Sequence, residues 1–174
     1  MVSKGLPSRE QAIELLRKSN CPINVIRHCE TVADLAIEIA NTLEKKGLKI
    51  DLELVETGAL LHDIGRSKTC GVDHGLVGAK IAESEGLPEA VVKIIKRHVG
   101  GGITAQEAEC FGWPKDVYAP LILEEKIVSY ADKLIDKSKR VPIDVEIGRL
   151  GVEHKDGAER VRKLHQEITS LLGN

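Results

Sequence analysis

The sequence predicts an all-α protein that forms one domain. Apolar residues recur at helical spacing in one segment after another, and no stretch alternates apolar and polar residues long enough to indicate a strand. The 174 residues suit one domain and contain no internal repeat, low-complexity tract or linker. Aromatic residues make up only 2% of the chain, so the core must be built from leucine, isoleucine, valine and alanine.

Two helices are predicted before residue 50. Ser8 and, three residues later, Gln11 form a capping-box pattern that opens a short amphipathic helix. Asn20-Cys21-Pro22 ends it, and a long helix follows over about residues 23–46, before Gly47. The inward stripe of this long helix includes His28, four residues before Val32.

The next predicted helix, over residues 51–63, ends in a histidine and an aspartate side by side. Asp51 is placed to cap its start, and His62 continues an apolar stripe, so its side chain is expected to point inward. Gly65 is expected to be the left-handed residue that ends the helix. Two ligand-type side chains, His62 and Asp63, therefore lie near a helix C-terminus, where the dipole favours a cation.

The rest of the chain is predicted to be helical with glycine and proline breaks. Residues 66–73 are expected to form a loop, Gly100-Gly101-Gly102 to break the chain sharply, and residues 144–150 to form a short segment. The remaining helices are predicted over residues 74–84, 88–99, 104–112, 121–137 and 153–172.

The composition excludes several classes of partner. A formal net charge of −2 gives no reason to expect a nucleic-acid backbone as the main partner, and few aromatic residues argue against a base-stacking platform. Without a membrane-length apolar run or a signal-peptide core, the protein is expected to be cytoplasmic, with no membrane partner. The four cysteines form no Cys-x-x-Cys pair and are expected to be free thiols.

Six polar residues lie at or beside core-facing positions of the predicted helices. A single histidine on an apolar stripe is more often a hydrogen-bonded core residue than a ligand. Burying several unpaired imidazoles and carboxylates together would cost several kcal/mol, whereas a divalent metal would satisfy all of them. The set therefore indicates a metal site formed by His28, His62, Asp63, His74, His98 and Asp132.

In order and spacing, this set resembles the HD superfamily of metal-dependent phosphohydrolases. His62-Asp63-Ile64-Gly65 reproduces the HDIG motif, with His28 before it and Asp132 after it. The resemblance implies an HD-domain helical bundle with a core over about residues 22–137, on which the helix at 153–172 packs.

His74 and His98 fill the two places that distinguish the dinuclear branch of that superfamily. The resemblance implies two divalent ions, with Asp63 bridging them. Mixed imidazole and carboxylate ligands suit iron, manganese, cobalt, nickel or zinc. The first ion would be held by His28, His62, Asp63 and Asp132, and the second by Asp63, His74 and His98.

Within that superfamily, short segments of this sequence are most similar to the HD-type symmetrical diadenosine tetraphosphate hydrolases. The similar pieces are residues 74–79, Lys96-Arg97-His98 before the glycines, and Tyr130-Ala131-Asp132-Lys133. The chain departs from those enzymes after Lys133, where their proline-and-arginine ending is missing. It also resembles small archaeal HDIG proteins of unassigned function.

Candidate substrate-binding residues flank the expected ligands. Arg66, Lys68 and Lys133 could each reach a substrate phosphate, and the alternative for each is a solvated surface charge. Gly100 and Gly101 could let the backbone approach a ligand or could simply end a helix. Trp113 is expected to be a packing residue rather than a base-stacking one.

These features favour a metal-dependent phosphohydrolase that cleaves a phosphoester or phosphoanhydride bond of a small phosphorylated substrate, a nucleotide. The attacking group would be a hydroxide bridged by the two metals, with Asp63, Arg66 and Lys133 in catalytic roles. The alternatives are symmetrical diadenosine tetraphosphate hydrolysis and a non-enzymatic metal- or nucleotide-binding sensor. A purely structural adaptor would leave the buried polar set unexplained. A homo-oligomer is left open.

Overall fold

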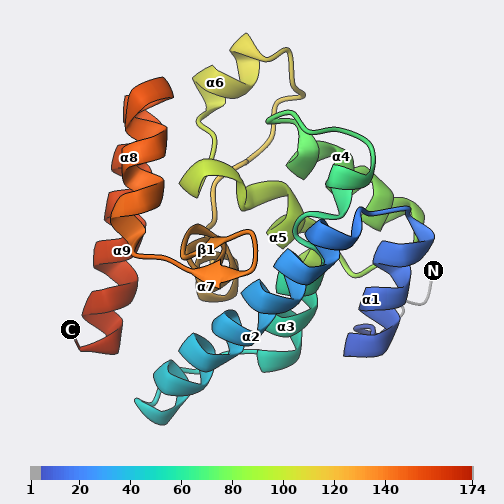
Figure 1. The fold of residues 1–174 in the computed structure, drawn as a ribbon, viewed down its shortest axis with the longest axis horizontal. Helices are drawn as coiled ribbons and strands as arrows, with labels where there is room; N and C mark the ends of the chain where they lie inside the picture. Colours follow the sequence, from blue (N-terminus) through green and yellow to red (C-terminus); the bar gives the residue numbers. More distant parts are fainter. Residues whose placement is uncertain (1–4, 174) are drawn as a thin grey trace.

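The computed structural model describes residues 5–173, and their regular secondary structure is almost entirely helical (Figure 1), so the predicted all-α fold is confirmed. Two 3-10 turns and a small hairpin complete it. The helices are α1 (Arg9–Lys18), α2 (Ile23–Lys45), α3 (Leu52–Leu61), α4 (His74–Ser84), α5 (Glu89–Arg97), α6 (Ala105–Cys110), α7 (Leu123–Lys133), α8 (Ile143–Glu153) and α9 (Lys155–Leu172). The turns are η1 (Ile64–Ser67) and η2 (Val99–Gly101), and the strands are β1 (Ile135–Asp136) and β2 (Lys139–Arg140).

Local capping signals determine where several helices begin. At the start of α1 the Ser8 hydroxyl accepts a hydrogen bond from the Gln11 backbone amide. The Gln11 side-chain oxygen accepts one from the Ser8 backbone amide, which completes a capping box. Asp51 caps α3 by accepting from the Leu54 amide at 3.0 Å. These helix starts are confirmed as the sequence predicted, because capping depends only on residues three positions apart.

An aliphatic core joins the helices that carry the polar set. The long helix α2 packs along α3 and α7, and α9 packs on the far side of α7 (Figure 1). A smaller cluster of Ile103, Ala108 and Tyr118 lies beneath α6, and Trp113 packs against it, as the packing interpretation expected. Among the described residues, no helix is long and apolar enough to cross a membrane.

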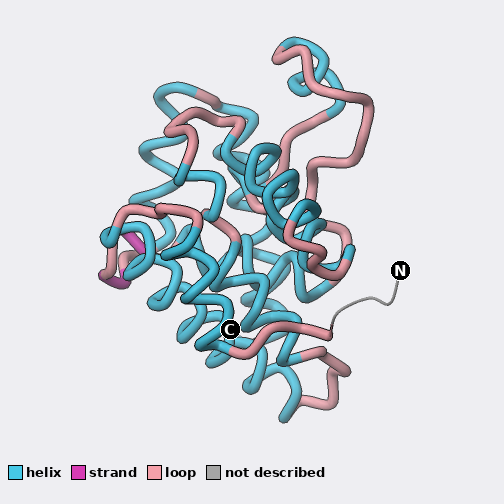
Figure 2. The backbone as a smooth tube through the Cα atoms, turned by 90° about the vertical axis from the view of Figure 1, so that its right-hand side faces the viewer, coloured by secondary structure: helices cyan, strands magenta, loops and turns pink. Residues whose placement is uncertain are grey.

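The segment after α7 differs from the prediction. The helix expected to reach residue 137 ends at Lys133, and the chain reverses in a two-stranded hairpin (Figure 2). Each strand has only two residues, too few for an alternating pattern to reveal. Lys137 in its turn has a left-handed φ of 57°. The segment near 144–150 is a full helix, α8, and the last helix begins at Lys155 rather than near 153.

Gly65 has a different role from the one predicted. It lies inside η1, its φ is not left-handed, and α3 already ends at Leu61. A Cβ at this position would lie 1.9 Å from the carbonyl oxygen of His74 and 2.7 Å from the amide nitrogen of Gly78. Glycine is therefore required because η1 and α4 meet backbone to backbone, and this contact places His74 beside Asp63.

Candidate metal centre

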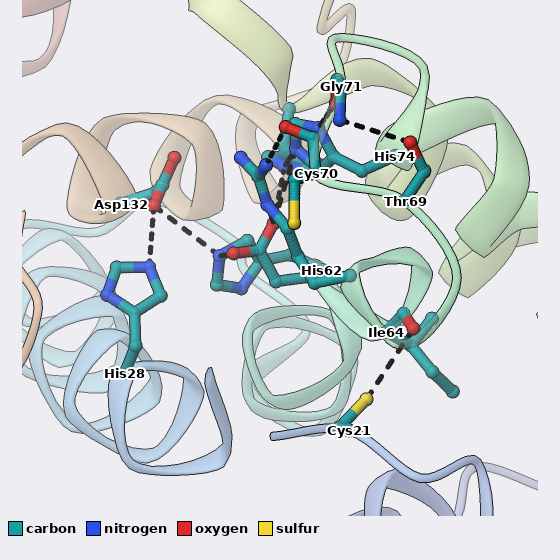
Figure 3. Close-up of polar contacts among 12 residues, drawn as sticks. Cys21, His28, His62, Ile64, Thr69, Cys70, Gly71, His74 and Asp132 are labelled. Atoms are coloured by element: carbon teal, nitrogen blue, oxygen red, sulfur yellow. Dashed lines mark hydrogen bonds and ion pairs between the residues drawn. The ribbon is translucent and has the colours of Figure 1, made fainter. Parts of the chain in front are cut away.

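Ends of several helices bring the six predicted residues into one cluster. His62 and His98 are the C-cap residues of α3 and α5, and His74 is the first residue of α4. His28 comes from α2 and Asp132 from α7, and the rings of His28 and His62 both point toward Asp132 (Figure 3). His62 and His98 are 0% and 2% exposed, so imidazoles from distant parts of the sequence are packed together away from water.

Each of the four histidines donates its Nδ1 proton to a backbone carbonyl. The acceptors are the carbonyls of Lys137 for His28 (2.8 Å), Ala59 for His62 (2.7 Å), Gly71 for His74 (2.8 Å) and Ile95 for His98 (2.7 Å). In a neutral imidazole such a bond fixes the tautomer and the ring orientation and leaves Nε2 as the atom that can bind a metal. This is the usual outer arrangement around metal-binding histidines.

The acceptor of His28 differs from the other three in its origin. His62, His74 and His98 each use a carbonyl three residues earlier, because all three lie at helix ends, where such carbonyls are available. His28 lies inside α2, whose carbonyls are engaged in the helix. The hairpin turn supplies its acceptor instead, from Lys137, 109 residues away in the sequence.

The Nε2 atoms of His28 and His62 converge on Asp132. The Nε2 atom of His28 is 3.0 Å from Asp132 Oδ1, and that of His62 is 3.4 Å from the same oxygen. The His62 Nε2 is buried and has no hydrogen-bond partner among the described residues. Ligand atoms of His28, His62 and Asp132 lie within 4.8 Å of one another and could hold a metal ion.

The other two nitrogens converge on Asp63. The Nε2 atoms of His74 and His98 are 3.0 Å apart, and they lie 3.2 Å and 3.4 Å from Asp63 Oδ1. With both Nδ1 atoms protonated, two lone pairs face each other, which a cation between them would relieve. Ligand atoms of His62, Asp63 and His98 also lie within 4.8 Å of one another. Imidazole nitrogens and carboxylates together fit a divalent transition metal.

Protonation within the cluster favours metal binding. Burial raises the pKa of both aspartates, but the net pKa of each lies well below its ordinary value. His62, His74 and His98 lower it for Asp63; Lys133, His28 and His62 lower it for Asp132. Burial lowers the pKa of His98 to about 4. At neutral pH the carboxylates are therefore ionised and His98 is a neutral donor. Burial lowers the pKa of His28, but its hydrogen bond to Asp132 leaves that pKa raised, so a metal at His28 would replace a proton.

Two predicted cations lie beside the aspartates. The Lys133 ammonium is buried and forms an ion pair with Asp132 Oδ2. The Arg66 Nε is 3.5 Å from Asp63 Oδ1, while its Nη1 donates to the Cys70 carbonyl at 2.8 Å. Both side chains line the cleft that opens over the cluster.

A cleft of about 1140 Å³ opens over the cluster. His28, Asp63, His74 and Asp132 contribute to its floor, and Arg66, Lys133 and Gly100 also line it. Lys68 is exposed and does not line the cleft. Gly101 does not line it either, because it packs against α9, where its Cβ would lie 3.1 Å from Val161.

Several lining residues were not singled out from the sequence. The structure adds the cations Arg27, Lys137, Arg149 and Arg160, together with the exposed ring of Phe111. No local pattern indicates them, because they come from α2, the hairpin turn, α8, α9 and the end of α6, and meet only in the folded chain.

Comparison with known proteins places this cluster in a family. The HD domain family model matches residues 25–135, which contain all six residues of the cluster. An uncharacterised protein of Methanocaldococcus jannaschii is 46% identical over 167 residues, covering 94% of this chain and 98% of that protein.

Two further matches differ in coverage and in identity. A tRNA (cytidine(56)-2'-O)-methyltransferase of Picrophilus torridus is 38% identical over 173 residues, covering 98% of this chain. The chain spans only 49% of that protein's length. The L. monocytogenes phosphodiesterase PgpH HD domain, solved with cyclic-di-AMP, superposes with a TM-score of 0.58 at 18% identity, covering 92% of this chain and 96% of that one. The fold is thus shared, and the family match shows that the chain belongs to the HD domain family.

Proposed function

We propose that the chain is a metal-dependent hydrolase that cleaves a phosphoester or phosphoanhydride bond in a nucleotide. The observation that carries this proposal is the convergence of four imidazole Nε2 atoms on two ionised carboxylates at the floor of a cleft. Two ions would be held, one by His28, His62 and Asp132 and the other by Asp63, His74 and His98.

The chain's own residues would orient the substrate around these ions. Bound divalent ions supply Lewis-acid chemistry: they make water a nucleophile near neutral pH and neutralise charge on phosphoryl oxygens. Asp63 is near both groups, with Oδ1 facing His74 and His98 and Oδ2 3.8 Å from His62. Arg66 and Lys133 hold the two carboxylates and present positive charge to a phosphate in the cleft.

Two alternatives from the sequence remain predictions. One is symmetrical hydrolysis of diadenosine tetraphosphate, and the other is a metal- or nucleotide-binding sensor without turnover. The complete set of six ligand-type residues supports catalysis over a sensor. The complex of the PgpH HD domain with cyclic-di-AMP supports a nucleotide as the substrate class.

The half-length match to a tRNA methyltransferase favours a second candidate, a phosphate or phosphodiester group of an RNA. Nearly the whole chain is matched by about half of that protein, so in Picrophilus torridus a related segment is joined to the rest of a longer chain. Covalent joining raises the effective concentration of two modules that serve one substrate. The cationic residues of the cleft would suit an RNA phosphate as well as a free nucleotide.

A turnover screen tests both candidates. Purified protein would be assayed with Mn²⁺, Co²⁺ and Ni²⁺ against phosphomonoesters, cyclic nucleotides, nucleoside triphosphates, dinucleoside polyphosphates and short RNAs. We expect metal-dependent release of product from the wild type and loss of at least about 100-fold in Asp63→Ala. Asp144→Ala, which removes an exposed carboxylate outside the cleft, is the matched control. Absence of metal-dependent turnover with every substrate would rule out the enzyme.

A further inference from the structure

The outer part of the cleft is built differently from its floor. We call this part the outer cleft; its residues are Phe111, Val145, Arg149, His154 and Arg160. All except Phe111 lie beyond Ile135, outside the residues that match the HD domain family model. The outer cleft is therefore an addition by α8 and α9 to the matched domain, and it faces the same space as the metal cluster.

Two apolar side chains are exposed on this wall. Phe111 is 43% exposed and Val145 is 51% exposed, although both line a cleft. Apolar surface left open inside a concave site is typical of a surface that a ligand covers. Contact of this apolar surface with water is unfavourable, and a ligand with a flat apolar face would remove that contact.

The cleft has room for more than a reacting phosphate. Its volume of about 1140 Å³ lies slightly above the usual range for sites that enclose drug-sized ligands. A second cavity of about 460 Å³ shares Glu107, Phe111, His154 and Arg160 with it. The space therefore continues past the Phe111 ring, away from the metal cluster.

The charges of the outer cleft are already paired with carboxylates. The Arg160 guanidinium donates to Glu107 at 2.9 Å and to the Gly102 carbonyl at 2.8 Å, and Arg149 pairs with Glu146 at 2.7 Å. Neutralised pairs attract a second phosphate weakly but offer fixed donors and acceptors. An aromatic face beside such hydrogen-bonding groups suits a nucleobase better than an anion.

We propose that the outer cleft binds the base of a nucleotide substrate, with the base stacked on Phe111, while Val145 adds apolar surface to the same cleft. This inference rests on the proposed function, since it assumes that the phosphate lies at the metal cluster. Stacking of a base on an aromatic side chain raises affinity on the order of 10-fold to 100-fold and tolerates different bases.

Trp113 provides a direct signal for this stacking. Its ring centroid is 5.2 Å from that of Phe111, and it is the chain's single tryptophan, so a base on Phe111 should change its fluorescence. The Mn²⁺-loaded protein would be titrated at 4 °C with AMP, GMP, CMP, UMP and ribose 5-phosphate, with chromatography showing that each ligand stays intact. We expect at least one nucleotide to bind about 10-fold tighter than ribose 5-phosphate.

Variants separate stacking from general effects on folding. Phe111→Ala should reduce the preference for the nucleotide to less than about 3-fold and leave ribose 5-phosphate binding unchanged. Val145→Asp should do the same by charging the wall, and Val152→Asp is its matched control on α8, since Val152 is 88% exposed and does not line the cleft. Binding by the variants would be measured calorimetrically.

Either of two results would overturn the base site: equal wild-type affinity for all the nucleotides and ribose 5-phosphate, or a preference that survives both Phe111→Ala and Val145→Asp. Metal-dependent turnover without base preference would refute this inference and leave the proposed function standing. Base preference without turnover of any substrate would refute the proposed function and leave the base site standing.

Discussion

Replacing Gly65 with alanine should destabilise the protein more than the same change at Gly58 or Gly148. The added Cβ would lie 1.9 Å from the His74 carbonyl oxygen, 2.7 Å from the Gly78 amide nitrogen and 2.9 Å from the His74 carbonyl carbon. All three atoms belong to backbone, so η1 and α4 would have to separate by about 1 Å. We expect a loss of at least about 3 kcal/mol, the upper end of the range for overpacking.

The other two glycines provide matched comparisons. At Gly58 the three atoms nearest to the new Cβ all belong to the buried side chain of Ile94, at 2.5, 2.8 and 3.2 Å. One side chain must shift rather than two backbone segments, so we expect a loss of about 1–2 kcal/mol. At Gly148, inside α8, nothing lies within 4 Å, so alanine should stabilise by up to about 1 kcal/mol through helix propensity.

Urea unfolding of the three variants measures these differences. With a slope of about 2 kcal/mol per molar urea, Gly65→Ala should shift the midpoint down by about 1.5 M. The displaced α4 carries His74, so metal affinity should fall as well. A midpoint for Gly65→Ala equal to or above that of Gly58→Ala would refute the backbone-contact reasoning.

Three further predictions concern the metal, a buried ion pair and the hairpin turn. Chelation of bound metal should lower the melting temperature by about 5–10 °C relative to protein with free metal at 100 times the dissociation constant, because metal at that concentration adds about 2.7 kcal/mol to the free energy of unfolding. An unchanged melting temperature would contradict a metal-binding native state. Arg97→Met should cost about 3–5 kcal/mol in urea unfolding because it leaves the carboxylate of Glu125, 2% exposed, without its 2.8 Å partner; a loss below about 1 kcal/mol would refute this. Lys137→Gly should stabilise by about 1 kcal/mol by relieving a φ of 57° while keeping the carbonyl that holds His28, so that metal content stays unchanged; loss of metal would show that the Lys137 side chain contributes.

The parts of the fold that depend on neighbours in sequence were predicted well. Ser8 and Asp51 cap helices as expected because capping requires only a polar side chain and an amide three residues later. His62 and His98 point inward because each continues the apolar stripe of its own helix, which periodicity reveals directly. Their meeting in one cluster was inferred from the cost of burying six unpaired polar groups, and the family resemblance supplied only the division of these residues between two ions.

The parts that depend on distant contacts were missed. The role of Gly65 follows from the position of α4, which no pattern around residue 65 encodes. The His28 acceptor is a carbonyl 109 residues away, in a hairpin too short to leave an alternating pattern. Phe111 and Arg149 also line the cleft only because α6 and α8 fold over the same face. Lys68 follows the ligand pair closely in sequence, yet it does not line the cleft.

Metal stoichiometry tests the central claim most directly. Elemental analysis of protein purified without chelator, and of Mn²⁺-reconstituted protein, would be compared among the wild type, His74→Ala and His62→Ala. The two proposed ligand sets predict two ions per chain in the wild type and about one in each variant, since His62 belongs to the first set and His74 to the second. Two ions retained in His62→Ala, or none bound by a folded wild type, would contradict the proposed metal centre.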